Sequence, residues 1–506
     1  MTDCRLPALL QRQGLVWWNN MRLFEVLSCL LAIPPVALLF FVSPSRKTFL
    51  LCCLLPLLAL TVHIFWEGPH WQMYPLYVAI GILFLFAAIM RTPSGLTRVF
   101  AGILVILLVG ATIFLSWLAP MFRLTKPQGQ YSVGTRIFHL VDTNRDEESG
   151  PSPSGKRELM VQAWYPAEAP TGWILRHRKL AFYQRRKEVT SRASYRSVLR
   201  TNSFQDAPVL SGGAYPVLLY NPGWQGERTE STFQMEELAS HGFVVIAIDH
   251  TFFGGLVEFP DGRVADSKNA PEIGSFLHST IDEQWALGNK YVNVEARDDS
   301  FVLDQLQIMN EDAASPWFHR LDFSRVGVMG FSIGGAVAAQ TAYQDPRVKA
   351  ALNMDGWTFG DVGPKGLKKP FMIIYEDKAQ TIPTAAQLTT GSKPELLYWQ
   401  MSDQDYRQVT GSMRENGGYL LFLEGTNHVD FTDRSRFWSL AKMSGRGSVA
   451  PGRVHRILNA YTLAFFSHFL RGSREALLQT EPSPYSEVEF HRFIGESSLS
   501  ADSKSR

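Results

Sequence analysis

Long apolar runs dominate the first 120 residues of the chain. Four of them come close to the ~20 residues that a helix needs to cross the hydrocarbon core of a membrane. They lie at about 23–42, 48–66, 74–90 and 99–120, and short polar turns separate them. The pattern therefore predicts that residues 1–120 form a membrane anchor of four transmembrane helices.

The pattern changes after a short polar linker at residues 121–130. Short continuous apolar runs such as Pro216–Asn221 and Phe243–Asp249 are typical of strands buried in a parallel sheet. Helical stretches, including Thr229–His241, lie between such runs. Strands and helices that alternate in this way predict one α/β domain at residues 131–475, with a mostly parallel sheet and helices on both faces. We expect residues 476–506 to form a polar tail.

Charge follows the same division. Residues 1–120 hold seven Lys or Arg and three Asp or Glu, whereas the rest of the chain holds 42 and 44. A hydrophobic share of 46% excludes a disordered chain. The net charge of +2 gives no sign of the basic surface that nucleic-acid binding requires, so we expect no nucleic-acid partner.

The polar turns of the anchor bear on its orientation. The first and third turns carry four Lys or Arg and the middle turn carries none, which places the middle turn and the large domain outside. Three arginines in the N-terminal tail favour the opposite orientation. All four cysteines lie in residues 1–120, and a domain without thiols suits an oxidising compartment. We therefore expect a multi-pass membrane protein whose large domain is extracytoplasmic.

The strongest chemical motif is GFSIG at residues 330–334. It lies between a buried strand at 325–329 and a helix of small residues at 334–343. This is the G-x-S-x-G nucleophile elbow in the strand–turn–helix context that it requires. The tight turn exposes the hydroxyl of Ser332 at the positive end of a helix. Ser332 is the predicted nucleophile, and the backbone amide of Ile333 is a predicted oxyanion donor.

A serine nucleophile needs a histidine base and an acid that orients the histidine, and in α/β-hydrolases the order along the chain is serine, acid, histidine. His428 follows the apolar strand at 418–423, where this fold places its base, whereas the later histidines fall in a helix or in the tail. For the acid, Asp355 and Asp377 each follow a buried strand, and spacing alone does not decide between them.

The second oxyanion donor is expected in the loop NPGWQG at residues 221–226, which follows an early strand. Pro222 has no N–H, which leaves Gly223, Trp224 or Gln225, and Trp224 is the predicted donor. The sequence contains no H-E-x-x-H motif, Cys/His cluster or calcium loop, so it predicts neither a metal nor a cofactor.

These segments together resemble the platelet-activating-factor acetylhydrolases of the plasma type (group VII phospholipase A2). The resemblance runs from about Tyr131 to Arg471 and leaves out the anchor. Its most specific pieces are YPVLLYNPGWQGERT (215–229), LASHGFVVIAIDH (238–250), RVGVMGFSIGGA (325–336), NMDGWTFG (353–360) and GTNHVDFTD (425–433).

In that family the acid follows the strand after the elbow, which corresponds to Asp355, and the resemblance therefore favours Asp355 over Asp377. The nucleophile and base correspond to Ser332 and His428, and the second oxyanion amide to Trp224. The chain departs from the family where His-Gly is common, because it has Pro222 before Gly223. It also has a bulky Trp224 where a smaller apolar residue is usual, so we expect a reshaped acyl pocket.

The resemblance implies calcium-independent hydrolysis of short or oxidised acyl esters, including sn-2 esters of phospholipids. The main hypothesis is a membrane-anchored serine esterase that hydrolyses lipid or other small esters through an acyl-enzyme. One alternative is another ester, as in hydrolases of the dienelactone and polyester types, and the other is an inactive hydrolase domain that serves as a binding module. Residues 176–200, with nine Lys or Arg and one Glu, are either a surface for anionic lipid or a solvated insertion.

Overall fold

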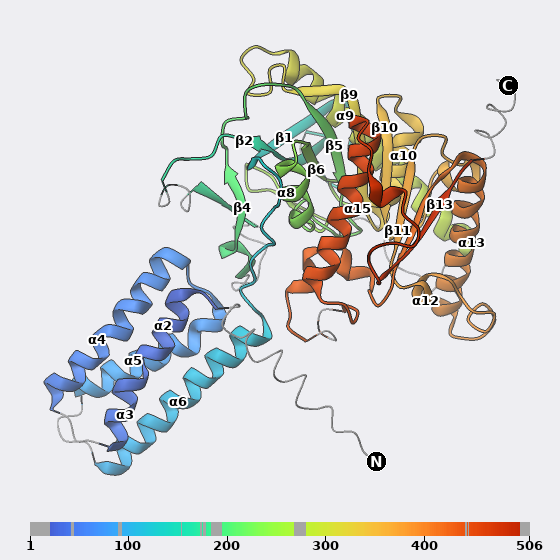
Figure 1. The fold of residues 1–506 in the computed structure, drawn as a ribbon. Coiled ribbons are helices and arrows are strands. Elements are labelled where there is room, and N and C mark those ends of the chain that lie inside the picture. Colours follow the sequence, from blue (N-terminus) through green and yellow to red (C-terminus); the bar gives the residue numbers. More distant parts are fainter. Residues whose placement is uncertain are drawn as a thin grey trace, which may run out of the picture. The chain divides into compact units, whose positions relative to one another are not determined.

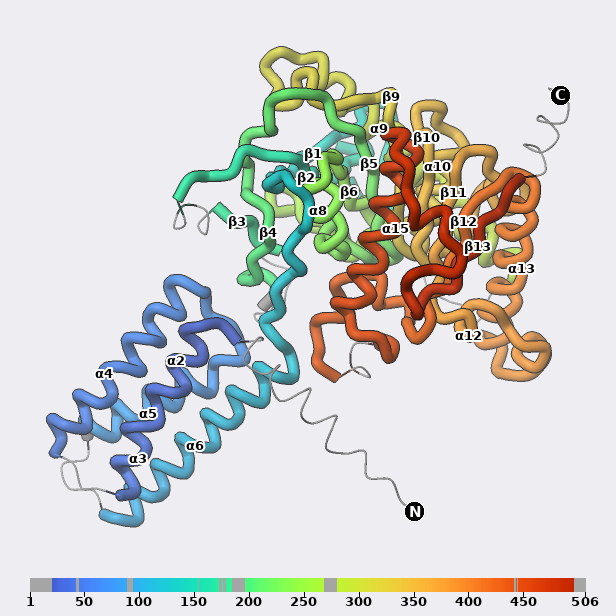
Figure 2. Tube along the Cα trace, in the orientation of Figure 1, coloured from blue at the N-terminus to red at the C-terminus, as the bar shows by residue number. Residues whose placement is uncertain are grey.

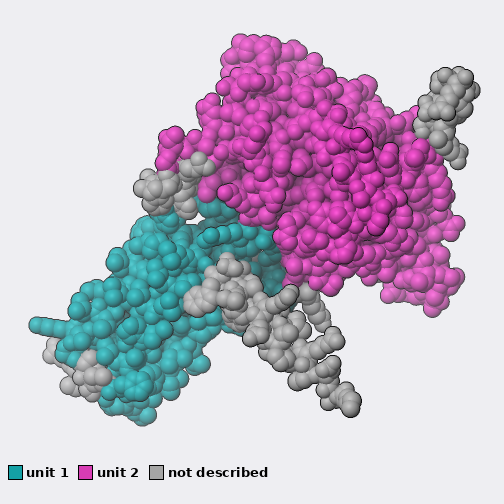
Figure 3. Space-filling view, viewed as in Figure 1, with its two compact units in different colours: residues 1–123, 182–201, 436–444 teal, residues 124–181, 202–435, 445–506 magenta. Residues whose placement is uncertain are grey.

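The structure is a computed structural model, and it describes residues 21–41, 45–89, 94–152, 154–172, 175, 179–183, 195–267, 280–440, 443 and 445–495. Much of the basic segment at 176–200, the end of the polar tail and nearly all of the N-terminal tail lie outside these residues. The chain divides into two compact units, which are coloured separately in Figure 3. Unit 1 contains residues 1–123, 182–201 and 436–444, and unit 2 contains residues 124–181, 202–435 and 445–506.

Unit 1 is built on four helical spans that are each long and apolar enough to cross a membrane. Their elements are α2 (Leu23–Leu31), α3 (Ile33–Phe41), α4 (Arg46–Val62), the π-helical turn η2 (His63–Glu67), the 3-10 turn η3 (Trp71–Met73), α5 (Tyr74–Ile89) and α6 (Gly95–Leu118). Small side chains such as Ala79, Ala101 and Cys53 are buried between the helices. Large apolar side chains such as Leu51 and Leu96 are exposed on the outside, which is the reverse of a soluble bundle.

Two later segments belong to unit 1, although the sequence places them inside the α/β domain. Their side chains explain this assignment. The ring of Phe122, just after the fourth span, lies 6.3 Å from that of Tyr183 and 5.6 Å from that of Phe437. Single aromatic contacts of this kind leave no periodic pattern in a sequence.

Unit 2 contains nearly all of an 11-stranded sheet, which Figure 1 and Figure 2 show from the same side. Its order is β13-β12-β11-β10-β9-β5-β6-β2-β1-β4-β3. The bounds are β1 (Ser132–Asp146), β2 (Lys156–Ala167), β3 (Leu180–Phe182), β4 (Arg200–Gln205), β5 (Tyr215–Asn221), β6 (Val244–Asp249), β9 (Leu321–Phe331), β10 (Val348–Met354), β11 (Phe371–Tyr375), β12 (Gly418–Leu423) and β13 (Val488–Phe493). The six strands from β12 to β6 are parallel, so their carboxyl ends lie along one edge. A separate short hairpin consists of β7 (Leu256–Glu258) and β8 (Val264–Asp266).

Helices cover both faces of this sheet. One face carries α8 (Thr232–Ser240) and α15 (Pro451–Arg471). The other face carries α9 (Ile281–Glu311), α10 (Ile333–Gln344) and α13 (Lys393–Asn416). Val217 and Leu219 of β5 pack in one core with residues of α9, α10 and α13. Leu218 points the other way, towards the site where Phe466 of α15 approaches Gly327. The red α15 and the green α8 lie side by side in Figure 1, although they are far apart in the sequence.

The predicted fold class is confirmed: a mostly parallel sheet carries helices on both faces and follows four apolar helices. The C-terminal end differs from expectation, because β13 lies within the segment expected to be a polar tail. It pairs antiparallel with β12 and buries Val488 and Phe490. Charged and polar residues alternate with these two, because only one side of this six-residue edge strand is buried. The segment is therefore polar enough on average to be taken for a tail in the sequence.

Candidate active site

The GFSIG motif forms a sharp turn between β9 and α10. Ser332 has φ 56° and ψ −128°, a backbone conformation that residues with a side chain rarely adopt. A Cβ atom at Gly330 would lie 2.1 Å from the carbonyl oxygen of Gly334, and one at Gly334 would lie 2.1 Å from that of Asn221. The two glycines are therefore required by the close approach of three backbone segments, which together present the Ser332 hydroxyl at the sheet edge.

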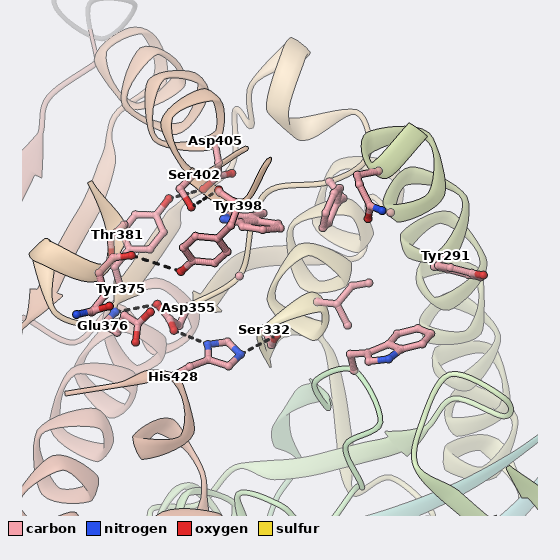
Figure 4. A pocket seen from close by; sticks show the side chains of 18 of the residues that line it. Tyr291, Ser332, Asp355, Tyr375, Glu376, Thr381, Tyr398, Ser402, Asp405 and His428 are labelled. Atoms are coloured by element: carbon pink, nitrogen blue, oxygen red, sulfur yellow. Dashed lines mark hydrogen bonds and ion pairs between the residues drawn. The ribbon is translucent and has the colours of Figure 1, made fainter. Parts of the chain in front are cut away.

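The predicted nucleophile, base and acid lie together at that edge. His428 Nε2 is 3.0 Å from Ser332 Oγ, and His428 Nδ1 is 2.5 Å from Asp355 Oδ2, as Figure 4 shows with dashed lines. The other carboxylate oxygen of Asp355 accepts the backbone N–H of Glu376 at 2.8 Å. The Asp355 side chain is 6% exposed and that of His428 is 45% exposed. The imidazole thus connects a hydroxyl that faces the pocket to a buried carboxylate.

The alternative acid, Asp377, has a different place. It caps the short helix α12 (Lys378–Thr381), where its Oδ1 accepts the N–H of Ala379 at 2.9 Å. Its Oδ2 accepts the N–H of Gly425 at 2.7 Å. Because Gly425 begins the loop that carries His428, Asp377 supports the position of that loop while Asp355 contacts the imidazole itself.

Hydrogen bonds distinguish the candidate oxyanion donors in the loop at 221–226. The N–H of Gly223 donates to Glu230 Oε1 at 2.7 Å, and that of Gln225 donates to the carbonyl oxygen of Phe253 at 3.2 Å. Trp224 lies between them, and within the described residues its N–H has no recorded acceptor. The amide of Ile333 is the first in α10, where N–H groups have no partner inside the helix. Trp224 and Ile333 both line the pocket with Ser332.

Glu230, which holds the Gly223 amide, is a site residue that the sequence reasoning missed. It is buried, and its Oε1 also accepts the hydroxyl of Tyr220 at 3.2 Å. Burial raises the pKa of its carboxyl to about 7. An acidic residue two positions before a completely buried helix was the only signal of its role in the sequence.

The pocket beside Ser332 has a volume of about 490 Å³, and its walls contain six Trp, Tyr or Phe side chains. Those walls include Trp224, Tyr291, Trp357, Phe359, Tyr375 and Tyr398, which come from five separate segments of the chain. No sequence motif joins them, and only Trp224 was singled out beforehand.

Two buried carboxyl groups also line this pocket. Burial and the nearby charge of Asp355 raise the pKa of Glu376 well above its ordinary range. Burial raises the pKa of Asp405 to about 6, although Asp405 accepts the hydroxyl of Tyr375 at 2.8 Å. In its protonated form Glu376 would add no second negative charge beside Asp355.

Two family models match the chain. One, described as "Platelet-activating factor acetylhydrolase, isoform II", matches residues 122–258, and the other, "PET hydrolase-like", matches residues 275–422. The first ends before the elbow, and the second includes Ser332 and Asp355.

Individual relatives give the same picture. The platelet-activating factor acetylhydrolase of Canis lupus familiaris is 24% identical over 60% of this chain and 70% of its own. That of Cavia porcellus is 24% identical over 52% of this chain and 60% of its own, and cutinase est2 of Thermobifida alba is 29% identical over 36% and 46%. Several of these relatives are thus matched over less than two thirds of their length.

Among solved structures, the ferulic acid esterase from Streptomyces cinnamoneus superposes with a TM-score of 0.56 at 26% identity. The superposition covers 73% of this chain and 98% of the esterase. Sequence and structure therefore agree: the chain has an α/β-hydrolase fold that follows four apolar helices, and it is similar to the platelet-activating-factor acetylhydrolases.

Proposed function

We propose that this chain is a serine ester hydrolase in which Ser332 is the nucleophile, His428 the general base and Asp355 the residue that orients and stabilises the imidazole. The observation that carries the proposal is the continuous hydrogen-bonded series from Ser332 Oγ through both nitrogens of His428 to Asp355 Oδ2. An inactive binding module has no need of this series at a strained elbow.

The reaction has two halves. Ser332 Oγ attacks the ester carbonyl carbon while His428 Nε2 takes the hydroxyl proton. The amides of Trp224 and Ile333 stabilise the resulting oxyanion. The carbon–oxygen bond to the alcohol then breaks, His428 returns the proton to that alcohol, and an acyl-Ser332 ester remains. Water, deprotonated by His428, hydrolyses this ester and regenerates the enzyme.

The substrate class we propose first is a short or oxidised acyl ester of a lipid, hydrolysed at a membrane. Two features support it: the relatives whose names describe acetylhydrolases, and the apolar helices that precede the domain. On this proposal the helices anchor the enzyme in the membrane and, from the charges of their polar turns, the domain is extracytoplasmic. Protease treatment of intact cells tests the last point, since a protected domain contradicts it.

The aromatic pocket supports a second candidate, an ester with an aromatic acid. Rings of Trp357 and Phe359 lie 6.1 Å apart, and Trp357 lies 5.5 Å from Tyr398, so a flat ring entering the pocket can stack on several faces. The solved neighbour whose title names ferulic acid, and the PET hydrolase-like match, are consistent with this candidate.

A labelling and substrate experiment tests both candidates. The purified full-length chain is treated with a fluorophosphonate probe and then offered a 2-acetyl phospholipid, an aliphatic ester and a methyl ester of an aromatic acid. We expect labelling in the wild type and none in Ser332→Ala. Labelling of Ser332→Ala would refute the nucleophile assignment. Hydrolysis of the aromatic ester without the phospholipid would select the second candidate.

A further inference from the structure

A cluster of polar side chains is buried at one end of the four-helix bundle in unit 1. Glu25 lies in the first turn of α2, His63 begins the π-helical turn η2, and His70 lies in the loop after it. All three are at most 3% exposed. One ligand atom from each residue lies within 4.8 Å of the other two. Ionisable groups among apolar helices are costly to bury, so they usually mark a functional site.

The hydrogen bonds of His70 determine which of its nitrogens carries a proton. The Gln72 side-chain amide donates to the carbonyl oxygen of Ala119 at 2.8 Å, so its own oxygen faces His70 Nδ1 at 2.9 Å. That oxygen only accepts, so Nδ1 carries the proton. In a neutral imidazole the lone pair of Nε2 then faces Glu25 Oε1, 3.0 Å away. Two acceptors face each other there, which calls for a cation between them.

His63 has the same tautomer as His70, but its Nε2 is paired with a hydroxyl group. Its Nδ1 lies 2.9 Å from Glu67 Oε2, so Nδ1–H donates to a carboxylate, and Nε2 accepts the hydroxyl of Tyr77 at 2.8 Å. A histidine that binds a metal characteristically donates its other ring N–H to a carboxylate or carbonyl group, which fixes the tautomer. Both His63 and His70 meet this requirement. The two imidazole rings lie 5.5 Å apart at an angle of 80°.

A bound proton accounts for only part of this cluster. A protonated His70 would satisfy the pair with Glu25, which also accepts from Arg22 Nε at 2.5 Å. It would not explain why a second imidazole, that of His63, lies beside the first and has a carboxylate partner of its own. Two imidazoles and one carboxylate are a ligand set that Zn²⁺ takes. The π-helical turn that begins at His63 is a local irregularity of the kind found at functional sites.

We propose that Glu25, His63 and His70 bind one Zn²⁺ ion, which joins the start of α2, the end of the second span and the loop before α5. Ligands about 2.1 Å from a shared ion are at most about 4.2 Å apart, and three ligand atoms that all lie within 4.8 Å of one another reach this geometry by small side-chain shifts. Tyr77 then releases His63 Nε2 or supplies the fourth ligand. The three ligands are distant in sequence, which is why no metal motif is visible there.

The test uses the full-length chain without a polyhistidine tag, purified in detergent, stripped with a chelator and titrated with Zn²⁺ and Co²⁺. We expect one equivalent of either ion to bind, and the Co²⁺ form to show the visible absorption of a site with nitrogen ligands. Replacement of His63 or His70 by Gln should weaken binding more than a hundredfold. Glu67→Gln, which keeps all three ligands, should weaken it about tenfold to a hundredfold.

His241→Gln is the matched control. His241 pairs with Glu237 at 3.0 Å, so it is also a histidine with a carboxylate partner, but it belongs to no three-ligand group among the described residues. Its replacement should leave metal binding unchanged. If the stripped wild type binds neither ion stoichiometrically, the cluster holds a proton only and the proposal fails. It also fails if binding survives replacement of both histidines. The wild-type titration decides the matter even if a variant does not fold.

Discussion

Three turns at the carboxyl edge of the sheet are held in two different ways. The elbow at Ser332 and the turn at Asp355 both have positive φ, and they interlock, since the N–H of Ser332 donates to the carbonyl oxygen of Met354 at 2.8 Å. The glycines within these two turns allow the two backbone segments to approach so closely. The loop at 221–226, proposed to hold an oxyanion donor, instead depends on side chains and carbonyl groups from other elements, such as Glu230 and Phe253. The geometry of a turn can be predicted from the sequence when residues of the turn itself determine it, but not when distant groups determine it.

The largest expected effect is on kcat and concerns Asp355, the proposed acid. Asp355→Asn should lower kcat by about 10⁴, because the amide stabilises the wrong tautomer of His428. Asp377→Asn is the control and should cost at most about tenfold, since Asp377 only supports the loop. Steady-state kinetics on a soluble ester measures both. Equal losses in the two variants would mean that the geometry at His428 does not distinguish the acids.

The next largest effect concerns the loop at 221–226, which groups from other elements hold in place. Glu230→Gln should lower kcat by about tenfold to a hundredfold with little change in KM, because a displaced Gly223 peptide misplaces the neighbouring Trp224 amide. Glu236→Gln is a close match, because Glu236 is also buried with a pKa raised to about 7 by burial, but it bonds Ser203 and Asn202 away from the pocket. Its kcat should stay near wild type. A similar fall in both variants would indicate general loosening rather than control of the loop.

A third change tests whether the glycines of the two interlocked turns are needed for stability. A Cβ atom at Gly356 would lie 1.9 Å from the carbonyl oxygen of Ser332, so Gly356→Ala should destabilise the domain by about 1–3 kcal/mol. Gly213→Ala serves as the control, because a Cβ atom there meets nothing within 4 Å. Thermal unfolding followed by tryptophan fluorescence gives both values. A Gly356→Ala protein as stable as Gly213→Ala would show that the two turns tolerate displacement.

The smallest expected effect is a pH dependence of stability. The folded-state pKa of Glu236 is raised above its ordinary 4.5, so its contribution is fully present below about pH 4.5 and is lost as the pH rises through 7. From pH 6 to 7.5 this residue should cost about 1 kcal/mol, which Glu236→Gln avoids because Gln has no charge. Unfolding temperatures of both proteins at the two pH values measure the difference. Identical pH slopes would contradict the raised pKa.

The same distinction explains how much the sequence predicts. The strand–elbow–helix unit and His428 are recognisable from neighbouring residues, and the alternation of elements predicts the fold class. Trp224 could be singled out because Pro222 lacks an N–H. Glu230 and Asp405 could not, because their partners lie on other elements, 7 and 30 to 47 positions away. Asp355 was separable from Asp377 only by family resemblance, since both follow strands at the same edge.

The edge strand β13 has a consequence for how copies of this protein meet one another. β12 leads into the loop that carries His428, and without β13 its backbone N–H and C=O groups would be open on one side. An open edge of this kind is a template for strand addition by a second molecule. The short β13 closes it and presents Glu489, paired with Lys378 at 2.6 Å, to the outside. β13 thus removes this template at the edge of the sheet that lies next to the loop of His428.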